Sequence, residues 1–560
     1  LAQRLFAHAL LGQGSARAAC SALAGLLPQG RPVDRLACAI AHRLAGQIAK
    51  ARMLLEGPAP DLPAWRLEQA RLAVLDGDLS GAAEVLSQIP DPGPLKTEAD
   101  WMSGYIAGLT GGPSSAVTHK LAARFDGADK ADKADKAEGR LCLAVLDYKT
   151  PDPSAASMNI GDWMQSAALL RHLVRHFGAD LTCDAPGLDL APLRDSWAET
   201  ERLTGTPPAH LVLMDRDFPQ AVAHRHPDRP IVALLHGWFL HRVWGQIRAL
   251  PLPEQVTPII LSFYLQRAED LTPDVVDFLK AQGPIGCRDL PTTHWLLNHG
   301  IEAFFSGCVT TTMGLTVAGT SEEALQVDTG DADEIDQNAP PYRRMDFAEA
   351  IETCLGLLTR YKRARSVATS RLHCYLPARA IGANVSFAAG DANDRRFDGL
   401  VLDGPGFDVI RARMTQLIDT VLDAVRSGVD TATLRDTWRA ATEPLVAEAR
   451  ADLARAEPIR LPARPGASSP ARSGVDVAIA LDQGFVAHAG AFLRSLRANS
   501  KAGIDVHVLT RGIDDTRFAA LQAEAPGLTL HQIAMEGRHA QFDAALDAGA
   551  GTISTMDRLL

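Results

Sequence analysis

The chain has 560 residues, of which 46% are hydrophobic and 22% charged, a composition typical of globular proteins. Its net charge of −11 gives no overall basic field for nucleic acid, and no stretch approaches the roughly 20 apolar residues that span a bilayer. We therefore expect roughly three or four folded domains, no nucleic-acid partner and no transmembrane segment.

The cysteines indicate a reducing compartment. Eight are spread along the chain without a Cys-x-x-Cys pair, unlike a disulfide framework or a zinc knuckle. We expect a cytoplasmic protein. The chain opens within a helical pattern and stops at "TISTMDRLL" without a terminating signal, so we also expect it to be a fragment of a longer protein.

Residues 1–125 are predicted to be helical repeats. In segments rich in alanine and leucine, glycines recur at intervals of 34, 31 and 34 residues, at Gly12, Gly46, Gly77 and Gly111. Small residues where two antiparallel helices turn, with alanine five residues further on, resemble tetratricopeptide repeats. The signature aromatic positions are mostly missing, so an irregular array of helical hairpins is the alternative. Either array would be a scaffold for a protein partner or for self-association.

Residues 126–139, "DGADKADKADKAEG", are charged and repetitive, which predicts a linker. Residues 140–455 alternate short apolar runs with helical patterns, as in parallel sheets that helices cover. Two such series, about 140–265 and about 284–455, predict two Rossmann-like halves that face each other across a cleft. Ligands would bind at the carboxyl ends of the strands.

The last part of the chain predicts a second α/β region. Residues 456–473 are rich in proline, serine and arginine and are predicted to be another linker. Residues 474–560 then give the pattern strand, loop, helix, strand, which opens a further α/β unit. The predicted fold class is therefore multidomain, with helical repeats followed by α/β domains.

Two segments place charged residues at the end of a predicted strand. "TSRLHCYLPARAIGANVSF" puts Arg371 and His373 after a buried strand, with Pro377 suited to the first turn of the next helix. "GPIGCRDLPTTHWLL" puts Arg288 and Asp289 in the same context. A helix start and a guanidinium group both favour an anion, so these segments predict an anionic ligand.

A third segment, "SMNIGDWMQSAALLRHL", places Asn159, Gly161 and Asp162 at the turn into a helix. Glycine there permits close backbone approach, and aspartate can cap the helix. Taken singly, Asp162 is an ordinary N-cap, each arginine an ordinary surface ion pair and His373 an ordinary structural histidine. Their joint position at strand and helix ends predicts a functional cleft instead.

Several ordered segments resemble the polysaccharide pyruvyl transferase family over residues 140 to about 402. They are "NIGDWMQSAALL", "HGWFLH", "LSFYL", "GPIGCRDLPTTHWLLNHGIEAFFSGCVTTT", "TSRLHCYLPARAIGANVSF" and "DRRFDGL". The resemblance implies a GT-B-like fold and transfer of the carbons of phosphoenolpyruvate onto a sugar, usually as a cyclic ketal. Phosphoenolpyruvate would be a co-substrate, and a sugar or polysaccharide the acceptor.

By this resemblance, Arg288, Arg371 and His373 match positions that hold phosphoenolpyruvate, and His373 is the candidate acid. The attacking hydroxyl group needs a base, for which Asp162 is the first candidate and Asp289 the reserve; Asp289 could equally orient Arg288. In "LLHGWFLH", His236 stands where the family often has asparagine. The expected site comprises catalytic His373 and Asp162 and substrate-binding Arg288, Arg371, Asn159, Gly161, Asp289 and Trp238; a core position is the alternative for Trp238.

Residues 474–560 resemble the start of a family-8 glycosyltransferase, which has a GT-A fold and uses a nucleotide sugar. In "AIALDQGF", Asp482 matches the nucleoside-contacting residue, although Phe485 replaces a usual tyrosine. An unrelated Rossmann-like fragment is the alternative. The chain stops before that family's metal-binding Asp-x-Asp, so we expect no cofactor and no metal ligand in this chain, whereas a complete domain of this kind can use a divalent metal.

The expected function is pyruvyl transfer from phosphoenolpyruvate to a glycan. One rival is a GT-B glycosyltransferase that binds a nucleotide sugar in the same cleft. The other is a non-catalytic repeat scaffold that carries a degenerate transferase fold.

Overall fold

The structure is a computed structural model of the chain. It describes residues 7, 16–25, 27, 31–57, 60–89, 92–110, 140–178, 181–331, 333–388, 397, 399–400, 405–455, 475–481, 486–499, 504–510 and 513–534. The predicted linkers 126–139 and 456–473, and Asp482, lie outside these residues. Contacts divide the chain into two compact units, Leu1–Ala388 with Arg396–Ala451, and Ala389–Arg395 with Asp452–Leu560.

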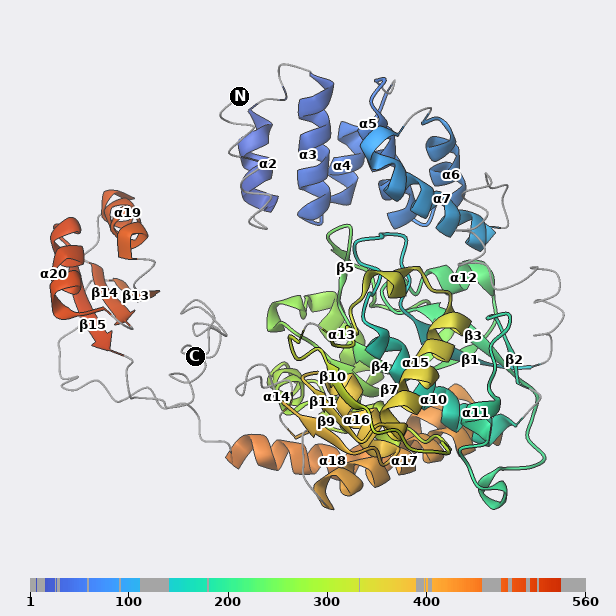
Figure 1. The fold of residues 1–560 in the computed structure, drawn as a ribbon. Helices are drawn as coiled ribbons and strands as arrows, with labels where there is room; N and C mark the ends of the chain where they lie inside the picture. Colours follow the sequence, from blue (N-terminus) through green and yellow to red (C-terminus); the bar gives the residue numbers. More distant parts are fainter. Residues whose placement is uncertain are drawn as a thin grey trace. The chain divides into compact units, whose positions relative to one another are not determined.

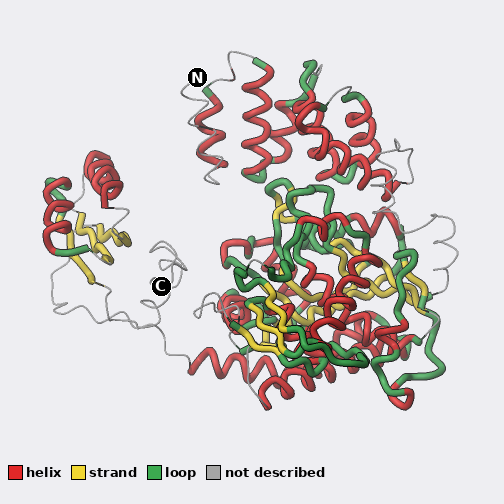
Figure 2. The backbone as a smooth tube through the Cα atoms, viewed as in Figure 1, coloured by secondary structure: helices red, strands yellow, loops and turns green. Residues whose placement is uncertain are grey.

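The first unit begins with helices alone, as Figure 2 shows. They stack side by side (Figure 1) and comprise α2 (Ala16–Ala24), α3 (Pro32–Leu44), α4 (Ile48–Leu54), α5 (Pro63–Leu75), α6 (Leu79–Ser87) and α7 (Lys96–Thr110). Gly46 and Gly77 make the turns between α3 and α4 and between α5 and α6, with φ of 79° and 82°. Glycine adopts this left-handed conformation at low cost. Gly46 and Gly77 thus mark helical hairpins, whereas Gly12 and Gly111 lie outside the described residues.

The helical array packs on the α/β part of the same unit. Phe218 and Trp244 share an apolar cluster with α5, α6 and α7. The buried Arg43 guanidinium pairs with Glu68 and donates to the carbonyl oxygen of Trp244, and the Tyr105 hydroxyl donates to Asp215. The scaffold surface predicted from the repeats is therefore engaged, at least in part, by the chain itself.

A seven-stranded parallel sheet forms the centre of this unit, in the order β2-β3-β1-β4-β7-β8-β9. Its strands are β1 (Leu141–Asp147), β2 (Thr182–Cys183), β3 (Ala209–Asp215), β4 (Ile231–Trp238), β7 (Val256–Tyr264), β8 (Ile285–Cys287) and β9 (Ala303–Phe305). All residues of β3, and all but the first of β1, are buried. Continuous apolar strands of this kind suit a parallel sheet that is covered on both faces.

A second parallel sheet has the order β10-β11-β12. It consists of β10 (Ala324–Val327), β11 (Ser366–Thr369) and β12 (Val385–Phe387). Helices α15 (Phe347–Arg363) and α16 (Leu372–Ala380) connect its strands. The predicted mixed α/β fold with parallel sheets is confirmed.

The predicted boundary between the two halves is wrong. The second half was expected to begin at about residue 284, yet β8 and β9 extend the first sheet to Phe305. Each of these strands has only three residues, too few for the sequence to indicate which sheet they join.

The remaining helices of this unit surround the sheets. They are α10 (Ile160–Phe177), α11 (Ala191–Arg194), α12 (Ala221–Arg225), α13 (Pro273–Gln282), α14 (Leu290–Asn298), α17 (Pro405–Arg426) and α18 (Thr431–Arg455). Helix α10 contacts β1 and β4, whereas α13 and α17 contact β7. A short antiparallel hairpin, β5 (Arg242–Val243) with β6 (Gln246–Ile247), carries Trp244 toward the helical array.

The second unit, taken by itself, contains a parallel sheet in the order β13-β14-β15. Its elements are β13 (Val475–Leu481), α19 (Val486–Asn499), β14 (Ile504–Thr510), α20 (Asp515–Glu524) and β15 (Thr529–Ala534). Val506, Val508 and Leu493 are fully buried in its core. Among the described residues of the whole chain, no helix combines the length and apolar character required to cross a membrane.

Candidate active site

Charged and aromatic side chains gather at the carboxyl ends of strands β3, β4, β7 and β8, where the starts of α10 and α16 also lie. We call this set the strand-end cluster: Asp162, Arg216, Asp217, His236, Trp238, His241, Tyr264, Arg288, Asp289 and His373. Strand β11 of the second sheet leads directly into α16. The cluster therefore joins the carboxyl ends of both parallel sheets, the usual place for ligands in open α/β folds.

His373 is the second residue of α16 and is 8% exposed. Its Nε2 atom lies 3.8 Å from the Cys308 thiol. Burial lowers the pKa of His373 to about 3, and the nearby Arg288 and His236 contribute to the shift. In the ligand-free protein at neutral pH, this imidazole is therefore neutral.

The start of α16 differs from the sequence prediction. Pro377 was expected in the first turn, but α16 begins at Leu372 and Pro377 lies inside it. Proline at that position cannot donate a backbone hydrogen bond. The earlier start places His373 on the helix rather than in the loop before it.

Gly161 brings the start of α10 against the start of α16. A Cβ atom on Gly161 would lie 2.6 Å from the Cβ atom of His373, so a side chain here would displace the histidine. The predicted close backbone approach is thus to another part of the protein. Both helices direct their amino-terminal dipoles into the same region, which favours negative charge there.

Asn159 caps α10, because its Oδ1 atom accepts a hydrogen bond of 2.9 Å from the Gly161 amide. Asp162, the predicted cap, faces other groups instead. Its Oδ2 atom accepts from the Ser157 hydroxyl at 2.7 Å and pairs with Arg216 Nη1 at 3.5 Å. Asp162 is therefore a buried carboxylate held by a cation.

Arg216, which sequence reasoning missed, follows β3 and is 2% exposed. Its guanidinium group binds Asp217 at 2.7 Å through Nη2 and lies 4.8 Å from the centre of the Tyr148 ring. Asp217 also binds His241 at 3.2 Å. Burial opposes the charge on Asp217, but Arg216 and His241 hold the pKa of this carboxyl well below its usual range. The run "MDRDF" was the available signal, since it places charges at a strand end.

Arg288 is 6% exposed, and its guanidinium group lies 3.7 Å from the centre of the Tyr264 ring. Its Nε atom is buried, makes no hydrogen bond and is 3.8 Å from Asp289 Oδ2. A buried guanidinium with unused donor capacity is suited to a planar carboxylate or to a phosphate. Arg288 is the residue of the cluster best placed to bind an anion.

Asp289, the reserve base, is fully buried, and its Oδ1 atom caps α14 by accepting from the Thr292 amide at 2.9 Å. A helix cap with no exposure does not suit a base that must reach a sugar hydroxyl. The 3.8 Å approach of Asp289 Oδ2 to Arg288 Nε instead suits the orienting role.

His236 is fully buried, and neither ring nitrogen makes a hydrogen bond. The pairing of β4 with β7 shifts by one residue between Leu235 and His236, and such a bulge redirects the side chains that follow. Burial lowers the pKa of His236 to about 3, with a contribution from Arg216. Two neutral imidazoles therefore lie among the cations of the cluster.

Trp238 is partly exposed at the end of β4. Its ring lies 5.7 Å from that of Tyr264 and 4.4 Å from that of His241. His241 is 24% exposed. These two side chains form the outer side of the cluster and offer an aromatic surface to a ligand.

The Arg371 side chain forms an ion pair outside the strand-end cluster. Its Nε atom lies 3.1 Å from Asp328 Oδ2, at the end of β10, and its side chain is 41% exposed. The arginine precedes α16 as its N-cap residue, two positions before His373. The structure thus brings Arg288, His373 and Gly161 together and directs the Arg371 side chain to an ion pair.

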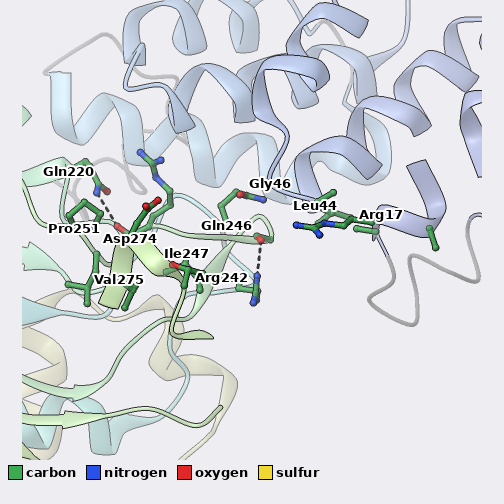
Figure 3. Close-up of a pocket in the computed structure, with 17 residues that line it drawn as sticks. Arg17, Leu44, Gly46, Gln220, Arg242, Gln246, Ile247, Pro251, Asp274 and Val275 are labelled. Carbon is green, nitrogen blue, oxygen red and sulfur yellow. Dashed lines mark hydrogen bonds between the residues drawn. The ribbon is translucent and has the colours of Figure 1, made fainter. Parts of the chain in front are cut away.

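The structure also contains a cavity of about 870 Å³ between the helical array and the β5–β6 hairpin. Among the lining residues that Figure 3 labels are Leu44 and Gly46 of the helical array and Arg242 and Gln246 of the hairpin. No residue of the strand-end cluster lines this cavity or a second one on α17. The cluster is thus a mostly buried set of groups whose partly exposed members include Trp238 and His241.

Comparison with known proteins adds no family assignment. No protein-family model matches the chain, and a search of curated proteins finds no match. The resemblance to pyruvyl transferases stays a prediction from the sequence segments.

Proposed function

We propose that the strand-end cluster binds phosphoenolpyruvate and transfers its pyruvyl group to a sugar of a glycan. The observation that carries the proposal is the meeting of Arg288, His373 and two helix starts at the ends of parallel strands. Phosphoenolpyruvate bears a carboxylate and a phosphate, which a buried guanidinium and helix amides can bind together. The two parallel sheets whose strand ends meet here support a GT-B-like arrangement.

The reaction requires one proton at the methylene carbon of the donor. That proton forms the methyl group and leaves positive charge at the central carbon. A first sugar hydroxyl attacks this carbon and loses its proton, and phosphate then leaves with the electron pair of its carbon–oxygen bond. A second hydroxyl completes the ketal and loses its proton. Of the two protons released, one balances the proton used and the other leaves with phosphate.

His373 is the proposed proton donor, but it is neutral before the donor binds. An opposite charge within about 4–6 Å raises the pKa of a histidine by roughly 1–3 units. Binding of an anion next to Arg288 and His373 would therefore supply the condition for protonation. Donation would be strongest at mildly acidic pH. Asp162, which lies in the first turn of α10 and whose carboxylate pairs with Arg216, is the proposed base for a sugar hydroxyl.

Turnover tests this proposal. The full chain, phosphoenolpyruvate and a panel of oligosaccharides should release phosphate and yield an acid-labile ketal. His373→Gln should lower the rate by about 10²–10⁴-fold, as expected for loss of general acid catalysis. Arg360→Met is the matched control, because Arg360 is exposed and pairs with the exposed Glu323 rather than with a residue of the cluster. Equal rates for wild type and His373→Gln would contradict the assigned role.

Transfer from a nucleotide sugar is the second candidate function. The partly exposed Trp238, beside Tyr264 and His241, offers an aromatic surface on which a base or a sugar ring could stack. Ligand-induced stabilisation separates the two functions. Stabilisation by phosphoenolpyruvate supports the first, and stabilisation by nucleotide sugars alone supports the second.

We also propose a cytoplasmic location, because all eight cysteines are free thiols and this suits a reducing compartment. The tetratricopeptide-like character of the helical array and the GT-A-like character of residues 474–560 are part of the same proposal. The parallel β13-β14-β15 sheet supports the latter. In a longer protein, the second region would extend or supply the acceptor glycan.

A further inference from the structure

A second group of buried polar side chains lies at the β2 edge of the large sheet. Asp184 follows β2, His210 lies on β3, and His226 follows α12; we call them the Asp–His–His cluster. Their exposed fractions are 2%, 1% and 4%. Neither the proposed reaction nor the sequence motifs use these residues.

The three side chains converge on one point. His210 Nε2 lies 2.9 Å from Asp184 Oδ1, and His226 Nε2 lies 2.7 Å from Asp184 Oδ2. One ligand atom from each residue lies within 4.8 Å of the others. The two imidazole nitrogens thus flank a single carboxylate in a buried space.

We propose that the Asp–His–His cluster binds a divalent transition metal ion, with zinc as the preferred ion. Zinc binds histidine nitrogen and carboxylate oxygen at about 2.0–2.2 Å, which separates neighbouring ligand atoms by roughly 3.3 Å in a tetrahedron. The observed separations of 2.9 and 2.7 Å, to the two oxygens of Asp184, would have to widen by about half an ångström. The ligand atoms of the three residues all lie within 4.8 Å of one another, so a modest side-chain adjustment would bring them around one ion. Each imidazole would then present an unprotonated Nε2 atom to the ion.

The surroundings of His210 suit that role. Its Nδ1 atom lies 2.7 Å from the Thr182 hydroxyl oxygen, which can accept the remaining ring proton. A hydrogen bond of this kind fixes the tautomer and orientation of a metal-binding histidine. Asp184 is likewise held, because its Oδ2 atom accepts from the Leu213 amide at 3.2 Å. Arg225 carries a charge that opposes a cation, but it is attracted more strongly to Asp215 than to Asp184.

A similar trio elsewhere in this unit provides a contrast. Asp419 approaches His176 at 3.0 Å and His172 at 3.6 Å, but it also binds Arg175 at 2.7 Å. The guanidinium group directly neutralises that carboxylate, and Asp419 is 26% exposed. The Asp419 trio is therefore not expected to hold a metal ion, although its residue types are the same.

A metal ion would connect three separate segments of the chain. Strand β2 has only two residues and lies at the edge of the sheet, so it gains little from its own hydrogen bonds. Through Asp184, His210 and His226, the ion would link the segment after β2 with strand β3 and with the end of α12. Its role would be structural, and it would not depend on the proposed transfer reaction.

Metal content tests this proposal. The full chain is incubated with zinc chloride, freed of excess ion by gel filtration and analysed by mass spectrometry of the metals. We expect one zinc ion per chain in the wild type and in Asp419→Asn, and loss of that ion in the double variant His210→Gln, His226→Gln. The Tm of the chelator-treated wild type should rise by ~5 °C with excess zinc.

Two results would overturn the proposal. One is wild-type protein with metal at the background level of the buffer and no zinc-dependent change in Tm. The other is equal zinc content in the wild type and in a folded double variant. The zinc content and the Tm change of the wild type need no comparison with a variant, so they test the proposal even if the double variant fails to fold.

Discussion

Substitution of Gly161 by alanine tests the contact between the starts of α10 and α16. The new Cβ atom would lie 2.6 Å from the His373 Cβ atom and 2.9 Å from Asn159 Oδ1. Real Cβ atoms do not approach so closely, so one helix start must move. Overpacking of this kind costs about 1–3 kcal/mol. Alanine also favours a helix over glycine by ~0.5–1 kcal/mol, which offsets part of the cost.

Gly356→Ala is the matched control for this substitution. Gly356 lies in α15, and a Cβ atom there would meet nothing within 4 Å. It should gain only the helix preference of ~0.5–1 kcal/mol. The difference between the two variants therefore isolates the steric cost. Urea unfolding followed by tryptophan fluorescence should place Gly161→Ala about 1–3 kcal/mol below Gly356→Ala in free energy of unfolding.

Activity provides the second readout for the same pair. A displacement of about 1 Å in a catalytic group can reduce the rate by ~10²-fold. We expect that loss in kcat/KM for Gly161→Ala and wild-type activity for Gly356→Ala. Equal stability and equal activity of the two variants would refute the close packing of Gly161 on His373 and the geometry derived from it.

Three further predictions concern buried charge. The His373 ring should show no NMR titration between pH 5 and 8 in the free protein, because its pKa is about 3. Phosphoenolpyruvate should raise this pKa. A pKa near 6.5 in the free protein would contradict the prediction. Burial raises the pKa of Asp215 to about 6, so this group stabilises the fold at low pH and loses that effect as pH rises through 6. Asp215→Asn should therefore raise the free energy of unfolding at pH 7.5 by up to about 3 kcal/mol. A lower free energy of unfolding for the variant, measured with urea, would contradict this prediction. Arg43→Met should lower the free energy of unfolding by about 3 kcal/mol and speed proteolysis of the helical array, because it leaves Glu68 buried with fewer partners. The control Arg52→Met, at an exposed ion pair, should lower the free energy of unfolding by at most ~1 kcal/mol.

Much of the fold follows from local patterns in the sequence. Strands β1, β3 and β4 are continuous apolar runs, and the recurring Gly46 and Gly77 mark helix turns. The sequence also placed Arg288 and His373 after the carboxyl ends of parallel strands, the usual place for ligands. It did not show that these strands, β8 and β11, belong to different sheets. These features depend on neighbouring residues along the chain, which the sequence displays directly.

Other parts of the site depend on pairing that local patterns do not show. The side chain of His236 is directed by a register shift between β4 and β7, a property of two strands together. Arg371 pairs with Asp328, which lies 43 residues earlier and directly follows β10. The cap of α10 is Asn159 rather than Asp162, since Arg216 and Ser157 engage the aspartate. Long-range partners such as these decide which charges remain available to a ligand.

Titration calorimetry of the full chain with phosphoenolpyruvate tests the central claim most directly. We predict saturable binding that Arg288→Met weakens by about 10-fold or more, because a hydrogen bond to a charged group contributes roughly 1.5–3 kcal/mol. The exposed Arg360→Met control should bind as the wild type does. Absence of phosphoenolpyruvate binding to the wild type, or equal affinity for wild type and Arg288→Met, would contradict the assignment of the strand-end cluster as a phosphoenolpyruvate site.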